Sequence, residues 1–236
     1  ANSLTPLSES RRMSRILILN PNSSTVITAS IAKCFAPLHG VTRHEIICTD
    51  LAEAPLGIES DADVMMVTPM VEVAILAAQA DAAVIACFSD PGVAQTRAAL
   101  PGRPVIGIAE AAYYAALQLG QRFGVVSLGP SSIARHASHI ERLGLTARLA
   151  GDRSILMTVA EGNHPDSLTT IQATGKALRD EDGASVLLLG CAGMGLHRAA
   201  LQEALGVPVI DPVQAAVAAA ITTLDLDYYP FGKTGA

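Results

Sequence analysis

Val84-Ile85-Ala86-Cys87 and Leu187-Leu188-Leu189-Gly190-Cys191 are two short apolar runs that each end in a cysteine. Each cysteine is followed, 17 residues later, by the triplet Pro-Val-Ile, at 104–106 and at 208–210. The two cysteines are therefore 104 residues apart, and so are the two triplets. A repeat that keeps one register is typical of a duplicated unit, so the chain is predicted to fold as two similar lobes that face each other. One cysteine would then lie on each side of a cleft between the lobes.

A second pair of matching segments lies upstream of the first. Residues 15–20, Arg-Ile-Leu-Ile-Leu-Asn, precede a Ser-Ser pair at 23–24, and residues 122–127, Arg-Phe-Gly-Val-Val-Ser, precede another at 131–132. Short β-branched runs of this kind alternate with alanine-rich stretches along the chain, which predicts right-handed βαβ units. The expected fold class is α/β, with two pseudo-symmetric lobes, each a four-stranded parallel sheet flanked by helices. The predicted strands are 15–20, 43–49, 82–87, 104–108, 122–127, 145–150, 184–190 and 207–210. The predicted helices are 24–36, 69–80, 92–100, 109–119, 131–143, 167–180, 196–205 and 212–224.

The duplication also sets the expected domain limits. Lobe 1 is expected to span 14–108 together with the C-terminal helix 212–224, and lobe 2 to span 109–211. The helix at 109–119 is the counterpart of the C-terminal helix, and we expect each of them to pack across onto the other lobe. Residues 1–13 are polar and are expected to form a flexible leader.

Composition narrows the class of partner. Half of the 236 residues are hydrophobic but only 3% are aromatic, which is typical of aliphatic helices packed on parallel sheets. The net charge is −6 and no Lys/Arg cluster is present, so a small-molecule substrate is favoured over a nucleic acid. The longest apolar-rich stretch, 70–78, is too short for a membrane span. The four cysteines show neither CxxC pairs nor zinc-like spacing, so we expect no metal site and a cytoplasmic location.

The duplicated cysteines are the candidate chemical groups. In an open parallel sheet, ligands bind beyond the carboxyl ends of the strands, and both Cys87 and Cys191 are predicted there. A single cysteine at a strand end is commonly a small buried hydrophobe, but duplication of the position argues for a function. Two thiols that face one carbon could remove a proton from one side and return a proton from the other. Nearby helix N-termini and glycine-rich amides are expected to lower the thiol pKa.

The loops beside the cysteines supply candidate substrate contacts. The loop from Asn20 to Thr25 has the composition of a helix N-cap that could also hydrogen-bond a carboxylate or an amide-rich ring. The matching stretch from Ser127 to Ser132 could bracket the same ligand. The expected substrate-binding residues are Asn20, Ser23, Ser24, Phe88, Ser89, Ser127, Ser131, Ala192, Gly193 and Met194.

Three motifs carry a resemblance to a known family. Residues 18–24, Ile-Leu-Asn-Pro-Asn-Ser-Ser, 86–92, Ala-Cys-Phe-Ser-Asp-Pro-Gly, and 189–194, Leu-Gly-Cys-Ala-Gly-Met, resemble the hydantoin and allantoin racemases of the aspartate/glutamate racemase superfamily. The resemblance extends over roughly residues 15–215. It implies a two-lobed α/β fold, cofactor-independent epimerisation of a five-membered ureide ring, and a homo-oligomer. It also implies that Cys87 and Cys191 are the acid/base pair.

Other functions stay open at this level. Within the same fold, an aspartate/glutamate-type amino-acid racemase, a cysteine-dependent maleate isomerase or a malonate decarboxylase are alternatives, although a decarboxylase would be expected to need one thiol. A two-lobed metabolite-binding protein is the non-enzymatic alternative. The acidic stretch 56–66 and the tail 227–231 differ from the segments expected of a hydantoin racemase, and such loops commonly determine which substituent is recognised.

Several side chains permit two interpretations. Asp90 and Glu110 could tune the thiols, but Asp90 before Pro91 fits a helix N-cap better. His197 could relay a proton but fits an exposed helix position better. Residues 161–165 are predicted to form a surface turn rather than a lid. The residues expected to be structural or solvated are Cys34, Cys48, Arg97, Arg135 and Arg198, and Tyr113 and Tyr114 are expected in the core, an interface or the pocket.

Overall fold

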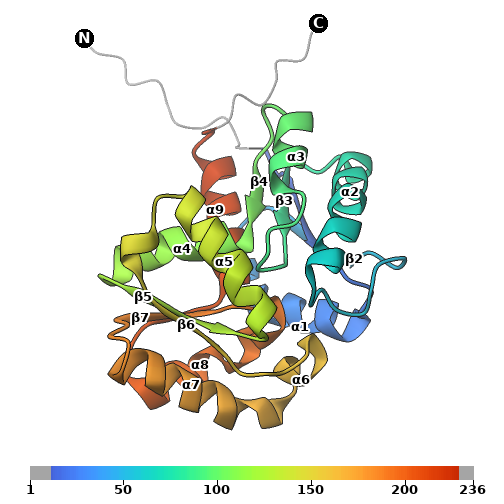
Figure 1. Ribbon diagram of the computed structural model, residues 1–236. Helices are drawn as coiled ribbons and strands as arrows, with labels where there is room; N and C mark the ends of the chain where they lie inside the picture. The colour runs from blue at the N-terminus through green and yellow to red at the C-terminus, as the bar shows by residue number, and fades with distance from the viewer. Residues whose placement is uncertain (1–11, 229–236) are drawn as a thin grey trace, which may run out of the picture.

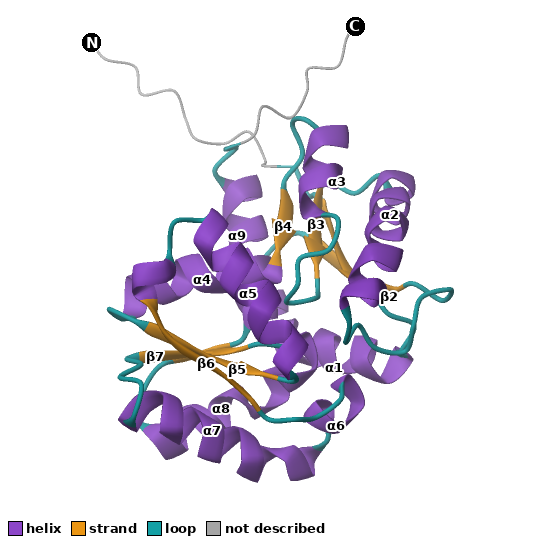
Figure 2. Cartoon of the chain, in the orientation of Figure 1, coloured by secondary structure: helices purple, strands orange, loops and turns teal. Residues whose placement is uncertain are grey.

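The computed structural model describes residues 12–228 and contains two four-stranded parallel sheets (Figures 1 and 2). The strand order is β2-β1-β3-β4 in the first sheet and β6-β5-β7-β8 in the second, so the same topology occurs twice. The strands are β1 Arg15–Asn20, β2 Glu45–Asp50, β3 Ala82–Ile85, β4 Val105–Gly107, β5 Phe123–Ser127, β6 Leu149–Ser154, β7 Val186–Leu189 and β8 Val209–Ile210. The predicted pair of four-stranded parallel sheets is therefore confirmed.

Helices cover both faces of each sheet (Figure 1). In the first sheet α1 and α9 pack on one face and α2 and α3 on the other, whereas α4 and α5 lie opposite α7 and α8 on the second sheet. The helices are α1 Thr25–Phe35, α2 Asp61–Ala78, α3 Val93–Ala99, α4 Ile108–Leu119, α5 Pro130–Arg142, α6 Val159–Asn163, α7 Leu168–Asp180, α8 Arg198–Leu205 and α9 Pro212–Asp225. Because parallel strands with helices on both faces are shielded from water, the central strands β3 and β7 are fully buried and wholly apolar.

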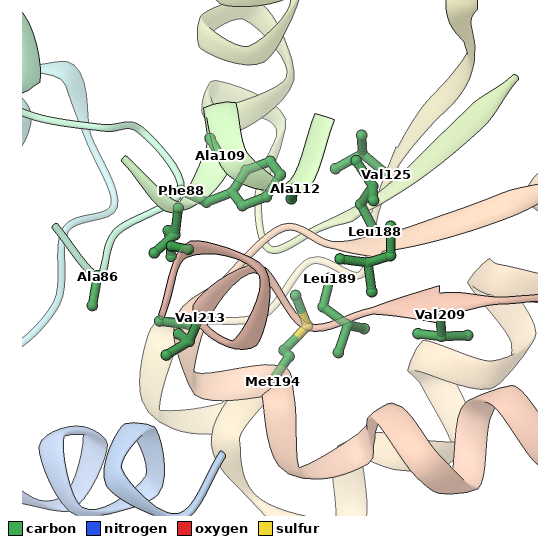
Figure 3. Close-up of a cluster of buried hydrophobic side chains, with 14 of the residues drawn as sticks. Ala86, Phe88, Ala109, Ala112, Val125, Leu188, Leu189, Met194, Val209 and Val213 are labelled. Carbon is green, nitrogen blue, oxygen red and sulfur yellow. The ribbon is translucent and has the colours of Figure 1, made fainter. Parts of the chain in front are cut away.

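The two halves share one core. Helices α4 and α9 pack against each other, and α1 packs against a 3₁₀ segment at Ala192–His197 that directly follows Cys191. Figure 3 shows Phe88 and Ala109 from the first part of the chain in one cluster with Leu188 and Met194 from the second. Burial of this apolar surface from both halves couples them, so the sheets are held at a fixed mutual orientation.

Carboxylates cap the two equivalent helices α4 and α9 from non-equivalent positions. Asp90 accepts hydrogen bonds from the amides of residues 109 and 110, each at 3.0 Å. Asp211 accepts them from the amides of residues 213 and 214, at 2.8 and 3.4 Å. The capped amides are 104 residues apart, which is the spacing of the repeat, but one carboxylate comes from the loop after Cys87 and the other from the residue before α9. The expectation that Asp90 is the N-cap of the helix that follows it was wrong, because Gly92 occupies that position; the Asp90 carboxyl group instead accepts from the first amides of α4.

Several boundaries differ from the predicted ones. Helix α2 begins at Asp61 and not near Pro69, because Ser60 and Asp63 form a reciprocal capping box there and the helix accommodates the proline inside. Strand β6 begins at Leu149, after a 3₁₀ turn over 146–148. A similar capping box at Thr158 starts the short helix α6 where a surface turn was expected. Most of the expected leader 1–13, up to residue 11, and residues 229–231 of the tail lie outside the described residues.

No helix in the described part of the chain combines the length and apolar character needed to cross a bilayer.

Candidate active site

Cys87 and Cys191 line one small pocket. Both follow the carboxyl end of an inner strand of their half, β3 or β7, by two residues. The pocket has a volume of about 40 Å³ and takes its walls from both halves of the chain. The lining residues are Asn20, Asn22, Ile27, Ile58, Ala86, Cys87, Phe88, Ser89, Leu128, Ser132, Arg135, His136, Val159, Gly190, Cys191, Ala192 and Gly193.

Burial dominates the electrostatics of Cys87. Desolvation raises the pKa of its thiol to about 11, and the carboxylate of Asp90 acts in the same direction. The backbone N–H and the hydroxyl of Ser89 hydrogen-bond the sulfur and, with the positive charge of Arg135, lower the pKa in part. Arg135 Nε in turn donates to Ser89 Oγ at 3.3 Å. A thiolate at Cys87 would therefore be held by a chain of donors that ends in a guanidinium.

Cys191 is surrounded by amides rather than by charged side chains. Burial raises the pKa of its thiol to about 12, whereas hydrogen bonds from the backbone N–H groups of Gly193 and Met194 lower it. Charge on Cys87 raises the pKa of Cys191, which means that the two thiols interact electrostatically. The expectation that nearby amides would lower the thiol pKa values was wrong for the net effect, because the cost of burying a thiolate exceeds the gain from these donors.

The loop after β1 forms a compact hydrogen-bonded turn beside the thiols. Asn20 Nδ2 donates to Asn22 Oδ1 at 2.8 Å and to Thr28 Oγ1 at 3.0 Å. Ser24 caps α1 by accepting from the Ile27 amide. Asn20 and Asn22 line the pocket, and neither Ser23 nor Ser24 is among its lining residues. The turn therefore places amide side chains, and not hydroxyl groups, next to the cysteines.

Ser127 reaches the pocket only through another side chain. It is fully buried, and its hydroxyl hydrogen-bonds both Asp152 and His136 Nδ1, the latter at 3.2 Å. His136 Nδ1 also lies 2.8 Å from Asp152 Oδ2. His136 lines the pocket and packs edge-on against Phe88. A buried carboxylate and hydroxyl thus fix an imidazole at the pocket wall.

Two further predicted contacts, Ser131 and Met194, do not line the pocket. Ser131 is exposed, and its hydroxyl donates to the Glu59 carbonyl at 2.8 Å, which ties α5 to the loop before α2. Met194 is fully buried in the core, as Figure 3 shows, although its backbone N–H reaches Cys191. The predicted contacts that do line the pocket include Phe88, Ser89, Ala192 and Gly193.

Comparison with known proteins assigns the family. Residues 16–220 match the family model described as Asp/Glu/Hydantoin racemase. The chain belongs to the Asp/Glu/hydantoin racemase family. This racemase is 37% identical over 222 residues to a hydantoin racemase from Paenarthrobacter aurescens, with 91% of this chain and 92% of that protein covered. It is 34% identical over 217 residues to a hydantoin racemase from Pseudomonas sp. (strain NS671), with coverage of 90% and 86%.

A solved structure gives the same result. The allantoin racemase from Klebsiella pneumoniae superimposes with a TM-score of 0.85 at 29% identity, over 94% of this chain and 91% of that chain. The resemblance inferred from the three motifs, the α/β fold and the racemase class of enzyme are thereby confirmed. Within residues 12–228 of the racemase, no three His, Cys, Asp or Glu side chains come together in a way that could hold a metal ion.

Sequence reasoning missed the α5 side of the racemase pocket. Arg135 was expected to be solvated, but its side chain is only 15% exposed because it bridges Ser89 and Asp61 between the halves. His136 lies three residues after Ile133 and four before Ile140, so it falls on the apolar face of its helix, and this pattern could have marked it as buried.

The expectation for His197 was wrong, whereas Tyr113 lies in one of the places expected for it. His197 is buried rather than exposed, and its Nε2 lies 3.1 Å from Ser167 Oγ, away from the residues that line the pocket. Tyr113 is fully buried in the core, where its ring packs against Phe88 and Phe123.

Proposed function

We propose that this racemase inverts the configuration at C5 of a hydantoin-type ring, with Cys87 and Cys191 as the two bases. The single observation that supports this most is that equivalent cysteines from the two halves line one narrow pocket. The names of the curated relatives and of the solved neighbour support a five-membered ureide ring, hydantoin or allantoin, as the substrate. Of the substrate contacts predicted from the sequence, we propose those that line the pocket, with Ser127 acting through His136; they are Asn20, Phe88, Ser89, Ala192 and Gly193.

In this mechanism one thiolate removes the C5 proton and the electron pair of that C–H bond moves into the neighbouring carbonyl to give an enolate. The opposite thiol then gives its proton to the other face of C5, and the enolate electron pair forms the new C–H bond. The enzyme ends with the thiol and thiolate exchanged, so the same machinery handles both enantiomers. We propose that Asn22, which lines the pocket, donates through Nδ2 to a ring oxygen, while Asn20 holds Asn22 in place by donating from its own Nδ2 to Asn22 Oδ1.

The two thiols have different donors. Ser89 and the positive charge of Arg135 favour a thiolate at Cys87, whereas Cys191 has backbone amides as its donors. We infer that the first thiolate forms at Cys87. A charge there disfavours a second thiolate at Cys191, which keeps one proton in the pair as the reaction requires.

The test uses an enantiopure 5-substituted hydantoin in D₂O, with loss of optical rotation and deuterium entry at C5 followed together. Cys87→Ser and Cys191→Ser should each abolish racemisation, by at least a thousandfold, and one variant should retain exchange for a single enantiomer. Cys48→Ser is the matched control, because Cys48 lies on β2 with its sulfur against the Thr28 carbonyl. Full activity in both pocket variants would exclude the two-thiol mechanism.

The remaining assignments are also proposals. We propose that lobe 1 comprises 14–108 with 212–224 and lobe 2 comprises 109–211. We propose a cytoplasmic homo-oligomer that needs no cofactor, which light scattering of the purified protein and assay after exhaustive dialysis against a chelator would test.

A further inference from the structure

A second cavity adjoins the thiol pocket. It has a volume of about 350 Å³ and shares Phe88, Ser89, Arg135 and His136 with the smaller pocket of about 40 Å³. Because the two cavities share this wall, a substituent on a ring held beside the thiols can extend into the larger cavity, whose size is typical of a ligand site.

The α5 side of this larger cavity is basic. Arg135, His139 and Arg142 line it at intervals of four and three residues, so they form one stripe along the helix. Arg142 is exposed, and no ion pair involving it is found among residues 12–228. Burial, followed by the positive charge of Arg142, lowers the pKa of His139, so the two arginines supply the positive charge of this stripe.

Acidic groups near the cavity do not offset this charge. Asp61 is the carboxylate in the cavity wall, and it is 78% exposed and paired with Arg135 at 2.7 Å. Asp90 Oδ2 lies 4.0 Å from His139 Nδ1, and the same carboxyl group caps α4. Glu110 forms an ion pair with Arg97. The guanidinium of Arg142 is the cation left to receive an anion.

We propose that the larger cavity binds the C5 substituent and selects a carboxylate on it, so that the preferred substrates are hydantoins with an acidic side chain. This inference rests on the proposed function and adds the substrate class to it. Arg142 would hold the carboxylate through its fork of N–H donors, and Arg135 would add positive charge at the entrance. The lining residues Asp61 and Val64 belong to the acidic stretch 56–66 that sets this chain apart in sequence.

The test compares two substrates of nearly equal shape, 5-(2-carboxyethyl)hydantoin and its neutral amide, 5-(2-carbamoylethyl)hydantoin. The wild-type enzyme should prefer the acid at least tenfold in kcat/KM. Arg142→Gln should lower the acid-to-amide ratio about tenfold, and Asp61→Asn should raise it, because it removes the competing carboxylate. Lys33→Gln, the same change of charge at an exposed position on α1, should leave the ratio unchanged.

The outcomes separate this inference from the proposed function. A wild-type preference for the amide, or a ratio that Arg142→Gln does not move, would overturn the acidic-substituent site while racemisation itself stands. If neither compound is racemised or exchanges deuterium at C5, the proposed function fails. Calorimetry would then compare the binding affinities of the acid and the amide to test the cavity assignment by itself. Tenfold tighter binding of the acid would then support the cavity assignment, and equal or absent binding would overturn it.

Discussion

Replacement of Ser89 by alanine should shift the pH profile of the enzyme rather than simply inactivate it. The Ser89 hydroxyl donates to Cys87 and links it to Arg135, whose Nε lies 3.3 Å from Ser89 Oγ. A hydrogen bond to a charged group contributes roughly 1.5–3 kcal/mol, and one pKa unit corresponds to about 1.4 kcal/mol. Since the Ser89 backbone N–H still donates in the variant, we take the lower limit, which predicts that the Cys87 pKa rises by about one unit.

The wild-type profile follows from the same groups. With the pKa of Cys87 raised to about 11, only a small fraction of the enzyme carries a thiolate near neutrality, and this fraction grows tenfold per pH unit. The value of kcat/KM, measured polarimetrically between pH 7 and pH 9.5, should therefore rise with unit slope. Ser89→Ala should give a parallel line displaced by about one unit to higher pH, so its activity at pH 8 should be about tenfold lower.

The control is Ser131→Ala, because Ser131 is exposed and bonds the Glu59 carbonyl away from the thiols. Its profile should coincide with that of the wild type. A wild-type profile that reaches a plateau near pH 8 would show that the thiolate forms with an ordinary pKa, and the reasoning from burial would be refuted. An Ser89→Ala profile with lower activity but no displacement would refute the role of the hydroxyl.

Two further predictions concern the cap of α4. Gly107→Ala should lower the free energy of unfolding, measured by urea denaturation, by about 1–3 kcal/mol, because a Cβ at this position overlaps the carboxyl group of Asp90. A variant as stable as the wild type would mean that the Asp90 side chain can move aside. Burial raises the pKa of Asp90 to about 7 in the folded protein, so its contribution to stability is fully present below the unfolded value near 4 and is lost as pH rises through about 7. The stability of the wild type should therefore fall relative to that of Asp90→Asn as pH rises from 4 to 8, as measured by thermal unfolding. A stability difference that does not depend on pH would contradict the raised pKa.

The repeat made the fold and the thiols predictable from sequence. Cys87 and Cys191 stand at equivalent ends of apolar strands, and strand periodicity with helix caps is a local signal that one chain segment carries by itself. The start of α2 was misplaced because Pro69 resembles a first-turn proline, whereas the reciprocal bonds of Ser60 and Asp63 decide the boundary.

The α5 side of the site depends on contacts between distant segments. His136 is fixed by Asp152 on β6, and Arg135 bridges Ser89 and Asp61 from the other half of the chain. No local pattern encodes such pairings, because each partner alone is an ordinary polar residue. Burial likewise decides the sign of the thiol pKa shifts, and it depends on how the two halves close over the pocket.

The two halves of the chain differ in the loops that follow the two cysteines. In the first half the loop after Cys87 supplies a hydroxyl at Ser89 and the carboxylate Asp90, whereas the corresponding loop in the second half supplies backbone amides at Gly193 and Met194. Once Asp90 caps α4 from this loop, residue 107 has to be glycine, and in the other half Asp211 occupies the equivalent position and Gly195 leaves room for it. The strands could thus keep their symmetry while each loop was altered separately. In the proposed mechanism the two faces of the substrate carbon would therefore meet thiols with different donors, Ser89 and Arg135 at Cys87 and backbone amides at Cys191.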